Sequence, residues 1–217
     1  MRYERKFTSE NQIKDSLYYY LYDINFREAY PSRNITSIYY DTHDFLLYNI
    51  SEEGISDRSK IRLRFYNQNT DKVIIEYKLK ASDQGWKTYS DLSIKENCFH
   101  ILNLPKPKFN YNNKICIPKS IDAYYLPTLL VMYKRNYFIS PEGTIRITLD
   151  YEIEYARVRE ANIYLNNPIG IKTYINVVEI KYNAEISEPY VINKVSDKLN
   201  LTLSRFSKYC NGIQTCF

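Results

Sequence analysis

Charged and apolar positions alternate most clearly in residues 58–65, where a cation stands at every second position. These cations are Arg58, Lys60, Arg62 and Arg64. Most positions between them are apolar, and successive strand side chains point to opposite faces, so the segment predicts a strand with one basic face. Like charges ~7 Å apart cost ~2.4 kcal/mol at an effective dielectric of about 20, and about a quarter of that in water. The segment is therefore either a wet sheet surface or part of an enclosed site for a polyanion.

The same alternation recurs along the chain and predicts about eight antiparallel strands, mostly joined by hairpins. We expect them at residues 2–7, 35–41, 58–65, 72–80, 86–93, 129–138, 144–154 and 174–182. Between the strands at 58–65 and 72–80, the polar residues 67–71 predict a hairpin turn. The strands therefore dominate the predicted fold.

Helical spacing of apolar residues predicts helices around this sheet. The first is expected from its cap, Ser9, to about Tyr22, and Pro31 with Ser32 predicts a turn. Residues 94–127 favour helices separated by a loop, which we interpret as a lid or an outer packing layer. The tail is helical in pattern from residue 188, and a last helix over residues 203–209 is expected to end at Gly212. The sequence thus predicts an α+β fold, an antiparallel eight-stranded β-barrel with peripheral helices and a C-terminal helix, in one domain over residues 1–217.

Charge gathers on one face of the expected strands. The cations with this parity are Arg2, Lys6, Arg58, Lys60, Arg62, Arg64, Lys78, Lys80, Lys87, Arg135, Arg146 and Lys181. The acids that share it are Glu4, Glu76, Asp150, Glu152 and Glu179. A merely wet face would carry near-neutral charge and many Ser, Thr and Gln residues, whereas closure into a barrel would aim these side chains inward. The pattern favours a hydrated basic tunnel with a small acidic cluster.

Such a tunnel suits a chain of phosphates. Arginine binds phosphate oxygens bidentately, lysine acts as a point charge, and carboxylates hold Mg²⁺ or Mn²⁺ that contacts the same oxygens. Phosphoryl transfer requires mainly positioning and charge neutralisation, so it needs no Ser/His/Asp triad, and none is evident. The sequence has no GxxxxGK[ST] or GxGxxG motif, which leaves the usual nucleotide-binding folds without support.

Composition bears on the protein's partners, metal binding and cellular location. A net charge of +5 over 217 residues is too modest for a protein that coats nucleic acid in general. Four cysteines without CxxC spacing argue against a zinc site. Cys210 and Cys216 could pair, but reduced thiols are expected because there is no export signal. With no run of about 18 apolar residues either, we expect a soluble, cytoplasmic protein.

Eight short motifs, in order along nearly the whole chain, together resemble the catalytic domain of the vacuolar transporter chaperone (VTC) type of polyphosphate polymerase. They are Arg2-x-Glu4-x-Lys6, Tyr39-Tyr-Asp-Thr42, Ile61-Arg-Leu-Arg-Phe65, Glu76-x-Lys78, Tyr133-Lys-Arg135, Ile145-Arg-Ile-Thr-Leu-Asp150, Glu179-x-Lys181 and Ser204-Arg-Phe-Ser-Lys-Tyr209. That domain belongs to the triphosphate tunnel metalloenzyme superfamily, whose members hydrolyse inorganic triphosphate, thiamine triphosphate or RNA 5′-triphosphates. The first motif departs from the superfamily's ExExK strand because Arg2 stands where an acid is usual. This resembles the polymerase branch and leaves one metal ligand fewer.

The resemblance implies an enzyme that transfers the terminal phosphate of ATP to a growing polyphosphate chain, with Mn²⁺ or Mg²⁺ as cofactor. The implied catalytic residues are Lys6, Arg62, Arg64, Lys78, Arg135, Arg146, Arg205 and Lys208. Further substrate-binding candidates are Arg2, Lys60, Lys80, Lys87 and Lys181. The implied metal ligands are Glu179, Glu4 and Asp150. The implied partners are ATP and inorganic polyphosphate, with no specific nucleic acid and with a membrane partner left open.

Three functions stay open at this point: a polyphosphate polymerase, a tunnel triphosphatase acting on inorganic or nucleoside triphosphate, and a non-catalytic module that binds polyphosphate or RNA. Single residues also keep structural alternatives. Glu76 could simply pair with a neighbouring arginine, and Asp150 and Glu152 could face solvent near a strand end. Arg205 and Lys208 lie three apart, which predicts one helical face. The resemblance implies that this face lines the tunnel mouth, and the alternative is an ordinary solvated face.

Overall fold

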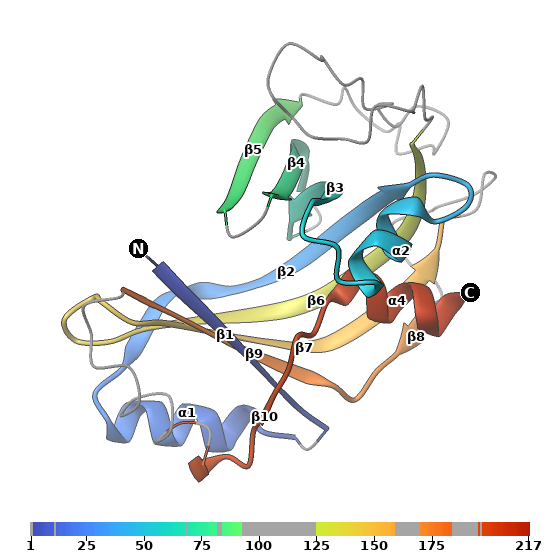
Figure 1. The fold of residues 1–217 in the computed structure, drawn as a ribbon. Helices are drawn as coiled ribbons and strands as arrows, with labels where there is room; N and C mark the ends of the chain where they lie inside the picture. The colour runs from blue at the N-terminus through green and yellow to red at the C-terminus, as the bar shows by residue number, and fades with distance from the viewer. Residues whose placement is uncertain are drawn as a thin grey trace. The chain divides into compact units, whose positions relative to one another are not determined.

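The computed structural model describes residues 2–10, 12–67, 69–81, 84–92, 125–158, 170–183, 195 and 197–217 (Figure 1). These residues form a mostly antiparallel sheet of ten strands together with three helices. The strand order is β10-β1-β9-β7-β6-β2-β3-β4-β5, with β8 paired to β7. The predicted α+β class is confirmed. Within the described residues, however, the order has two ends, β10 and β5, and the strands number ten rather than eight.

The strands are β1 (Arg2–Ser9), β2 (Arg27–Asp41), β3 (Arg58–Tyr66), β4 (Asn69–Ala81), β5 (Gln84–Leu92), β6 (Leu126–Ile139), β7 (Arg146–Arg157), β8 (Ile171–Lys172), β9 (Asn176–Asn183) and β10 (Thr202–Leu203). The helices are α1 (Lys14–Asp23), α2 (Leu46–Glu52) and α4 (Lys208–Cys216). All the expected strands thus appear. β2 begins eight residues earlier than expected, and the other strand ends are shifted by at most three residues.

The chain divides into two compact units. The first holds Met1–Asn34, Met132–Glu154 and Lys172–Ser207. The second holds Ile35–Val131, Tyr155–Ile171 and Lys208–Phe217. Strands β2, β6 and β7 each contribute residues to both units.

In the first unit, β1, β9 and β7 place alternate apolar residues on one face. Phe7 lies opposite Val178, and Val178 lies opposite Leu149 on its other side. Helix α1 contributes Leu17 and Leu21 to the same core cluster, in which all five side chains are buried. Burial of each such side chain stabilises the fold by ~1.5–3 kcal/mol. The opposite face of these strands is therefore left for the charged residues.

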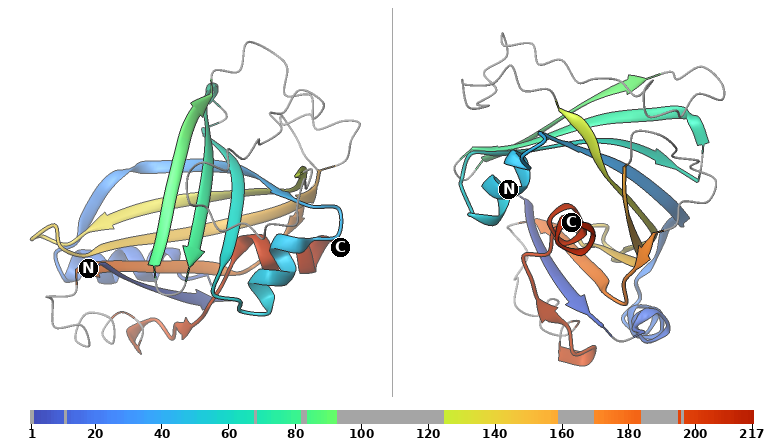
Figure 2. Two further views of the ribbon diagram at one scale, coloured as in Figure 1. Left: turned by 45° about the horizontal axis from the view of Figure 1, so that its top comes forward. Right: turned by 90° about the vertical axis from the view of Figure 1, so that its right-hand side faces the viewer.

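In the second unit, β3, β4 and β5 run side by side, and β3 also pairs with the C-terminal part of β2 (Figure 2). Along β3, Ile61, Leu63 and Phe65 are buried, whereas Lys60 and Arg62 on the other parity are half-buried. The basic and apolar faces predicted for this strand are confirmed.

Helix α4 runs through Gly212, where we expected it to end. A Cβ atom at Gly212 would lie 2.5 Å from Leu129 Cδ2 and 2.7 Å from Tyr155 Cδ1. Glycine therefore serves close packing of the helix here rather than a change of backbone direction. The same helix holds Cys210 and Cys216, which are buried free thiols, so the two do not form a disulfide.

Two other local expectations were wrong. Ser9 belongs to β1, and α1 begins only at Lys14, without a side-chain cap. The expected turn at Pro31 and Ser32 lies within β2. Proline is tolerated there because pairing with β3 begins at Ile35, beyond the position that lacks an N–H. The helices expected within residues 94–124 and 188–194 lie outside the described residues.

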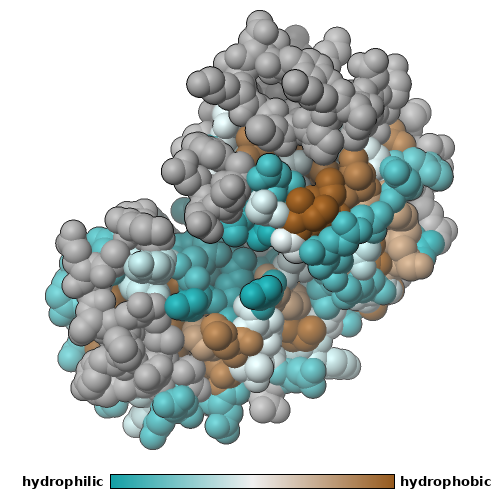
Figure 3. Space-filling model, viewed as in Figure 1, coloured by the Kyte–Doolittle hydropathy of each residue, from teal (hydrophilic) through white to brown (hydrophobic). Residues whose placement is uncertain are grey.

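The surface view agrees with this division into apolar core and charged faces. Most of the coloured surface in Figure 3 is hydrophilic, and apolar residues appear in separate patches. Large apolar side chains such as Tyr19 and Tyr174 are exposed individually, which is ordinary for a folded domain. In the part of the chain that the structure describes, no helix has the length and apolarity needed to span a bilayer.

Candidate functional site

The first unit brings charged residues of β1 and β9 together on the face opposite its core. Glu4 lies opposite Lys181, and Lys6 lies opposite Glu179. On the other edge of β9, Thr148 of β7 lies opposite Glu179. Opposed residues of antiparallel strands project to the same face, so the register itself makes these side chains meet.

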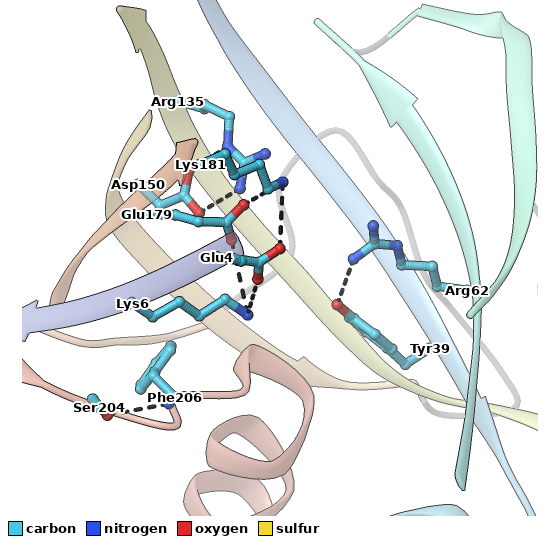
Figure 4. Close-up of polar contacts among 10 residues, drawn as sticks. All are labelled: Glu4, Lys6, Tyr39, Arg62, Arg135, Asp150, Glu179, Lys181, Ser204 and Phe206. Carbon is cyan, nitrogen blue, oxygen red and sulfur yellow. Dashed lines mark hydrogen bonds and ion pairs between the residues drawn. The ribbon is translucent and has the colours of Figure 1, made fainter. Parts of the chain in front are cut away.

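The four charged side chains contact one another with alternating sign (Figure 4). Lys6 Nζ lies 3.2 Å from Glu4 Oε1 and 3.8 Å from Glu179 Oε2. Lys181 Nζ lies 3.6 Å from Glu4 Oε2 and 2.5 Å from Glu179 Oε1. Both carboxylates therefore share the same two ammonium groups.

A buried arginine–carboxylate pair lies beside these residues. Arg135 Nε lies 2.5 Å from Asp150 Oδ1 and Nη2 lies 2.6 Å from Oδ2, so the guanidinium donates to both oxygens (Figure 4). The guanidinium also lies 5.4 Å from the centroid of the Tyr133 ring. Burial opposes its charge, but Asp150 and Glu179 help to raise the pKa of Arg135 well above its ordinary value. We call the whole group the first cluster: Glu4, Lys6, Arg135, Asp150, Glu179 and Lys181.

Glu179 is held in its ionised form by the first cluster. Its side chain is only 12% exposed, and burial by itself would favour the neutral acid. Lys181, Lys6 and Arg135 outweigh burial and hold the pKa of Glu179 below its ordinary value of 4.5. A negative charge is therefore fixed among cations at neutral pH.

The second unit gathers cations around one buried carboxylate, Glu76. Arg62 lies opposite Glu76 in the β3–β4 register, and its Nη2 lies 2.5 Å from Glu76 Oε2. Lys87 Nζ lies 2.9 Å from Oε1, and Arg64 Nη1 lies 3.7 Å from Oε2. Burial opposes ionisation of Glu76, but the three cations lower its pKa to about 2. We call these four residues with Tyr39 the second cluster.

Tyr39 of β2 lies opposite Arg62 and belongs to the same face. Its hydroxyl accepts a hydrogen bond from Arg62 Nη1 at 3.0 Å (Figure 4). Although burial would raise its pKa, Arg62, Arg64 and Lys208 outweigh burial and lower the pKa of Tyr39 to about 8. The Tyr209 ring stacks on it at a centroid distance of 5.1 Å. Tyr39 thus links the strand cations to the first turn of α4.

A buried carboxylate, Asp41, accepts hydrogen bonds from α2 and α4, the two helices described in the second unit. It accepts hydrogen bonds from the backbone N–H groups of Leu47 at 2.8 Å and Tyr48 at 3.0 Å, in the first turn of α2. It also accepts one from the Tyr209 hydroxyl. Burial raises the pKa of Asp41, and these hydrogen bonds oppose the rise. Asp41 thereby connects the first turn of α2 to the first turn of α4.

Comparison with known proteins identifies the family of this chain. A family model described as the VTC domain matches residues 2–217. The chain belongs to the VTC domain family. A search of curated proteins finds none that matches the sequence.

Several solved structures share the fold of this VTC domain at low sequence identity. A proposed adenylate cyclase from Bacillus halodurans has a TM-score of 0.60 and 16% identity, over 99% of this chain and 96% of that protein. A proposed adenylyl cyclase from Hippeastrum, described as having a dominant triphosphatase activity, has a TM-score of 0.53 and 13% identity over 100% and 97%. A third, from Vibrio parahaemolyticus, has a TM-score of 0.51 and 14% identity over 98% and 97%. The VTC domain therefore has the fold of the triphosphate tunnel proteins.

Several other predicted site residues of the VTC domain lie opposite one another on neighbouring strands. Lys60 lies opposite Lys78, and Lys78 lies opposite Lys87. Arg146 lies opposite Lys181 in the first unit. Lys78, Arg146 and Arg205 are exposed, whereas Lys60, Lys80 and Lys208 are half-buried. The backbone of Arg2 pairs with β9, but its side chain lies outside the described part of the VTC domain.

The expectation that Arg205 and Lys208 share a helical face is wrong. Helix α4 begins at Lys208, and Arg205 lies in the non-helical segment before it. There the Ser204 N–H donates to the Lys6 carbonyl at 2.9 Å, and Ser204 Oγ accepts from the Phe206 N–H at 3.1 Å (Figure 4). The first hydrogen bond attaches the segment to β1 and the second holds a turn within it, so the helix does not start earlier.

Asp150 and Glu152 of β7, which were expected on one charged face, differ in exposure. Asp150 is buried, but Glu152 is exposed and pairs with Lys134 at 2.7 Å. Glu152 has a φ of 51°, so the backbone leaves the extended conformation there and the alternation is interrupted.

Only part of the predicted metal set suits a divalent ion. Within the described residues, no three His, Cys, Asp or Glu side chains gather in one group. Glu4 and Glu179 lie close enough to contact the same lysines, and two carboxylates plus substrate phosphates are a usual environment for Mg²⁺. Asp150 does not fit, because both of its oxygens already accept hydrogen bonds from Arg135.

Sequence reasoning gave no role to Tyr39, Asp41 or Tyr209. The available signal was the Tyr39-Tyr-Asp41-Thr motif, in which Tyr39 has the parity that faces the basic side of β3. The contact with Tyr209 could not be expected, because 170 positions separate the two rings along the chain.

Proposed function

We propose that this VTC domain is an ATP:polyphosphate phosphotransferase that requires Mn²⁺ or Mg²⁺. The observation that carries the proposal is the ionised Glu179 held among Lys6, Lys181 and Arg135. A site that only binds anions gains nothing from a carboxylate among its cations. Phosphoryl transfer, in contrast, uses a carboxylate to hold the ion that bridges phosphate oxygens.

In the first cluster, substrate phosphates would replace the carboxylates as partners of Lys6 and Lys181. The two lysine side chains are 28% and 46% exposed, so both are accessible to a ligand. Arg135 is oriented by Asp150, which uses only part of the donor capacity of a guanidinium. Its remaining N–H groups would bind a phosphate oxygen in a fixed direction.

The second cluster supports phosphate binding because its cations outnumber its carboxylates. Three cations, Arg62, Arg64 and Lys87, surround one carboxylate, so the charges of these four side chains sum to +2. A terminal phosphate group carries about −1.5 to −2 charge at neutral pH. The second cluster is therefore suited in charge to the terminal phosphate group of the substrate.

Glu4 and Glu179 are the proposed metal ligands. They would hold a divalent ion, which would supply positive charge next to the substrate phosphates. The chain itself supplies two carboxylates, since Arg2 stands where the superfamily usually has a third acid. Two carboxylates leave most coordination positions of the ion to phosphate oxygens and water, as is common for Mg²⁺ bound with a nucleotide.

The proposal is tested by incubating the purified protein with ATP and Mn²⁺ and separating the products on a gel. We expect a phosphatase-resistant polymer, released together with ADP and absent when the metal is chelated. Steeply salt-dependent binding of polyphosphate or RNA without turnover would instead establish a binding module and refute the proposal.

A tunnel triphosphatase is the second candidate, because the similar structure from Hippeastrum is described with a dominant triphosphatase activity. It would release orthophosphate from tripolyphosphate or ATP and make no polymer. The same gel, combined with an orthophosphate assay, separates the two activities.

A substitution at Glu179 separates turnover from anion binding. Glu179→Gln removes the charge that would hold the metal but leaves the cations, so turnover should fall by about 100-fold or more while affinity for tripolyphosphate persists. Glu154→Gln is the matched control, because Glu154 is also a strand carboxylate with a lysine partner, Lys172 at 3.5 Å. Full activity of Glu179→Gln would show that the metal assignment is wrong.

A further inference from the structure

Three side chains of the first unit form a group that neither cluster includes. The Tyr30 and Tyr137 rings meet edge to face, with centroids 5.7 Å apart and planes at 88°. The Arg33 guanidinium lies 5.6 Å from the Tyr30 centroid and 5.7 Å from the Tyr137 centroid. One cation therefore contacts both rings and fixes their arrangement. We call Tyr30, Arg33 and Tyr137 the aromatic platform.

The platform is open to solvent, unlike the aromatic residues of the core. Tyr30 is 55% exposed although two neighbours hold its ring, and Tyr137 is half-buried. Exposure of a tyrosine is ordinary by itself, but this ring is also held in place by a second ring and a guanidinium. A held but uncovered ring, next to a guanidinium, is the kind of surface on which a nucleobase stacks.

The platform lies on the same face of β6 as the first cluster. Tyr137 and Arg135 are two positions apart on this strand, so they share a face and lie ~7 Å apart along it. Phe138, between the turn and these residues, points the other way and belongs to the core of the first unit. A ligand whose phosphates bind Arg135 could therefore extend along β6 to reach Tyr137.

We propose that the aromatic platform stacks against the nucleobase of a nucleoside triphosphate whose phosphates bind the first cluster. The proposal rests on the proposed function, because it takes the first cluster as the phosphate site. Stacking accepts any base, since every base has a π-face. The platform thus distinguishes a nucleotide donor from a bare phosphate chain, without choosing between adenine and guanine.

The test compares affinities for ATP and for inorganic tripolyphosphate, measured by titration calorimetry in the intact chain without turnover. Tyr30→Ala should weaken ATP binding about tenfold, the effect of losing one stacked base, and leave tripolyphosphate binding unchanged. Tyr30→Phe keeps a ring and should bind ATP nearly as the native protein does. Tyr19→Ala is the matched control, because Tyr19 is a tyrosine of α1 that is 82% exposed.

Several results would overturn the inference. They are equal loss of ATP and tripolyphosphate affinity in Tyr30→Ala, no loss of either, or no binding of ATP by the native protein. Binding of an oligoadenylate without a triphosphate that depends on Tyr30 would identify an RNA-stacking surface and also refute it. Because the readout is affinity, a protein that makes no polymer but loses ATP affinity in Tyr30→Ala would refute the proposed polymerase and support the platform.

Discussion

The second cluster makes a quantitative prediction for Glu76→Gln. Glu76 is the internal counter-ion of Arg62, Arg64 and Lys87, and its side chain is only 6% exposed. Glutamine keeps nearly the same shape but loses the charge. The substitution therefore leaves three cations facing one another, while the packing of β3 against β4 hardly changes.

The pKa of Glu76 gives the size of the effect. Lowering this pKa from 4.5 to about 2 corresponds to ~3 kcal/mol of preference for the ionised form. Arg62 and Lys87 are 24% and 47% exposed, so solvent screening reduces the expected loss of unfolding free energy to ~2 kcal/mol. In a chain of this length that lowers the Tm by ~4–8 °C. A lowered carboxyl pKa stabilises the fold above pH 4.5, and this contribution is lost as the pH falls toward 2.

Thermal unfolding at low salt, with and without tripolyphosphate, measures both consequences. Without ligand, Glu76→Gln should be less stable than the native protein. It should bind tripolyphosphate more tightly, because phosphate no longer competes with the carboxylate, so added ligand should narrow the difference in stability. Glu53→Gln, at an exposed position of the same unit, should change stability by less than ~0.5 kcal/mol. Unchanged stability, or weaker tripolyphosphate binding, would refute the assignment of Glu76 as a counter-ion.

Three further predictions concern single side chains. Tyr39→Phe should remove a tyrosine that titrates near pH 8 by ultraviolet absorbance. Its loss of stability relative to the native protein should grow from pH 8 to ~10 and be complete above ~10, because the lowered pKa stabilises the fold only where the hydroxyl is ionised. An unchanged titration would contradict this. Gly212→Ala should lower the unfolding free energy, measured in urea, by ~1–2 kcal/mol, because overpacking outweighs the gain in helix propensity. A more stable variant would show that Leu129 and Tyr155 can move to make room for the methyl group. Asp150→Asn should lower the unfolding free energy by ~3 kcal/mol, because Arg135 loses its carboxylate partner, and should leave Mn²⁺ affinity unchanged. Weaker Mn²⁺ binding at unchanged stability would show that Asp150 is a metal ligand.

The sequence alone predicted the charged strand faces, because alternation is a local property. Lys6 and Glu4 on β1, and Arg62 and Arg64 on β3, are two residues apart, so their shared side follows from the geometry of a strand. That argument does not say which strands pair. The contact between Lys6 and Glu179 depends on the register of β1 against β9, which hydrogen bonds between distant segments determine.

The ends of helices were predicted less well, since tertiary contacts override local signals there. Gly212 has the sequence context of a helix end, but the space between Leu129 and Tyr155 requires it within α4. The charged side chain that caps α2 belongs to Asp41, which precedes the helix by several residues and is also bound by a distant tyrosine. Neither requirement can be derived from the residues next to the helix.

The strict alternation along β1 constrains how this strand can vary in length. Glu4 and Lys6 reach the charged side of the strand only because Phe7 enters the core on the other side. Inserting or deleting one residue between Lys6 and Phe7 would force either the aromatic ring into water or the two charges into the core. Changes of two residues keep both sides intact, so viable length variants of this strand should differ by even numbers.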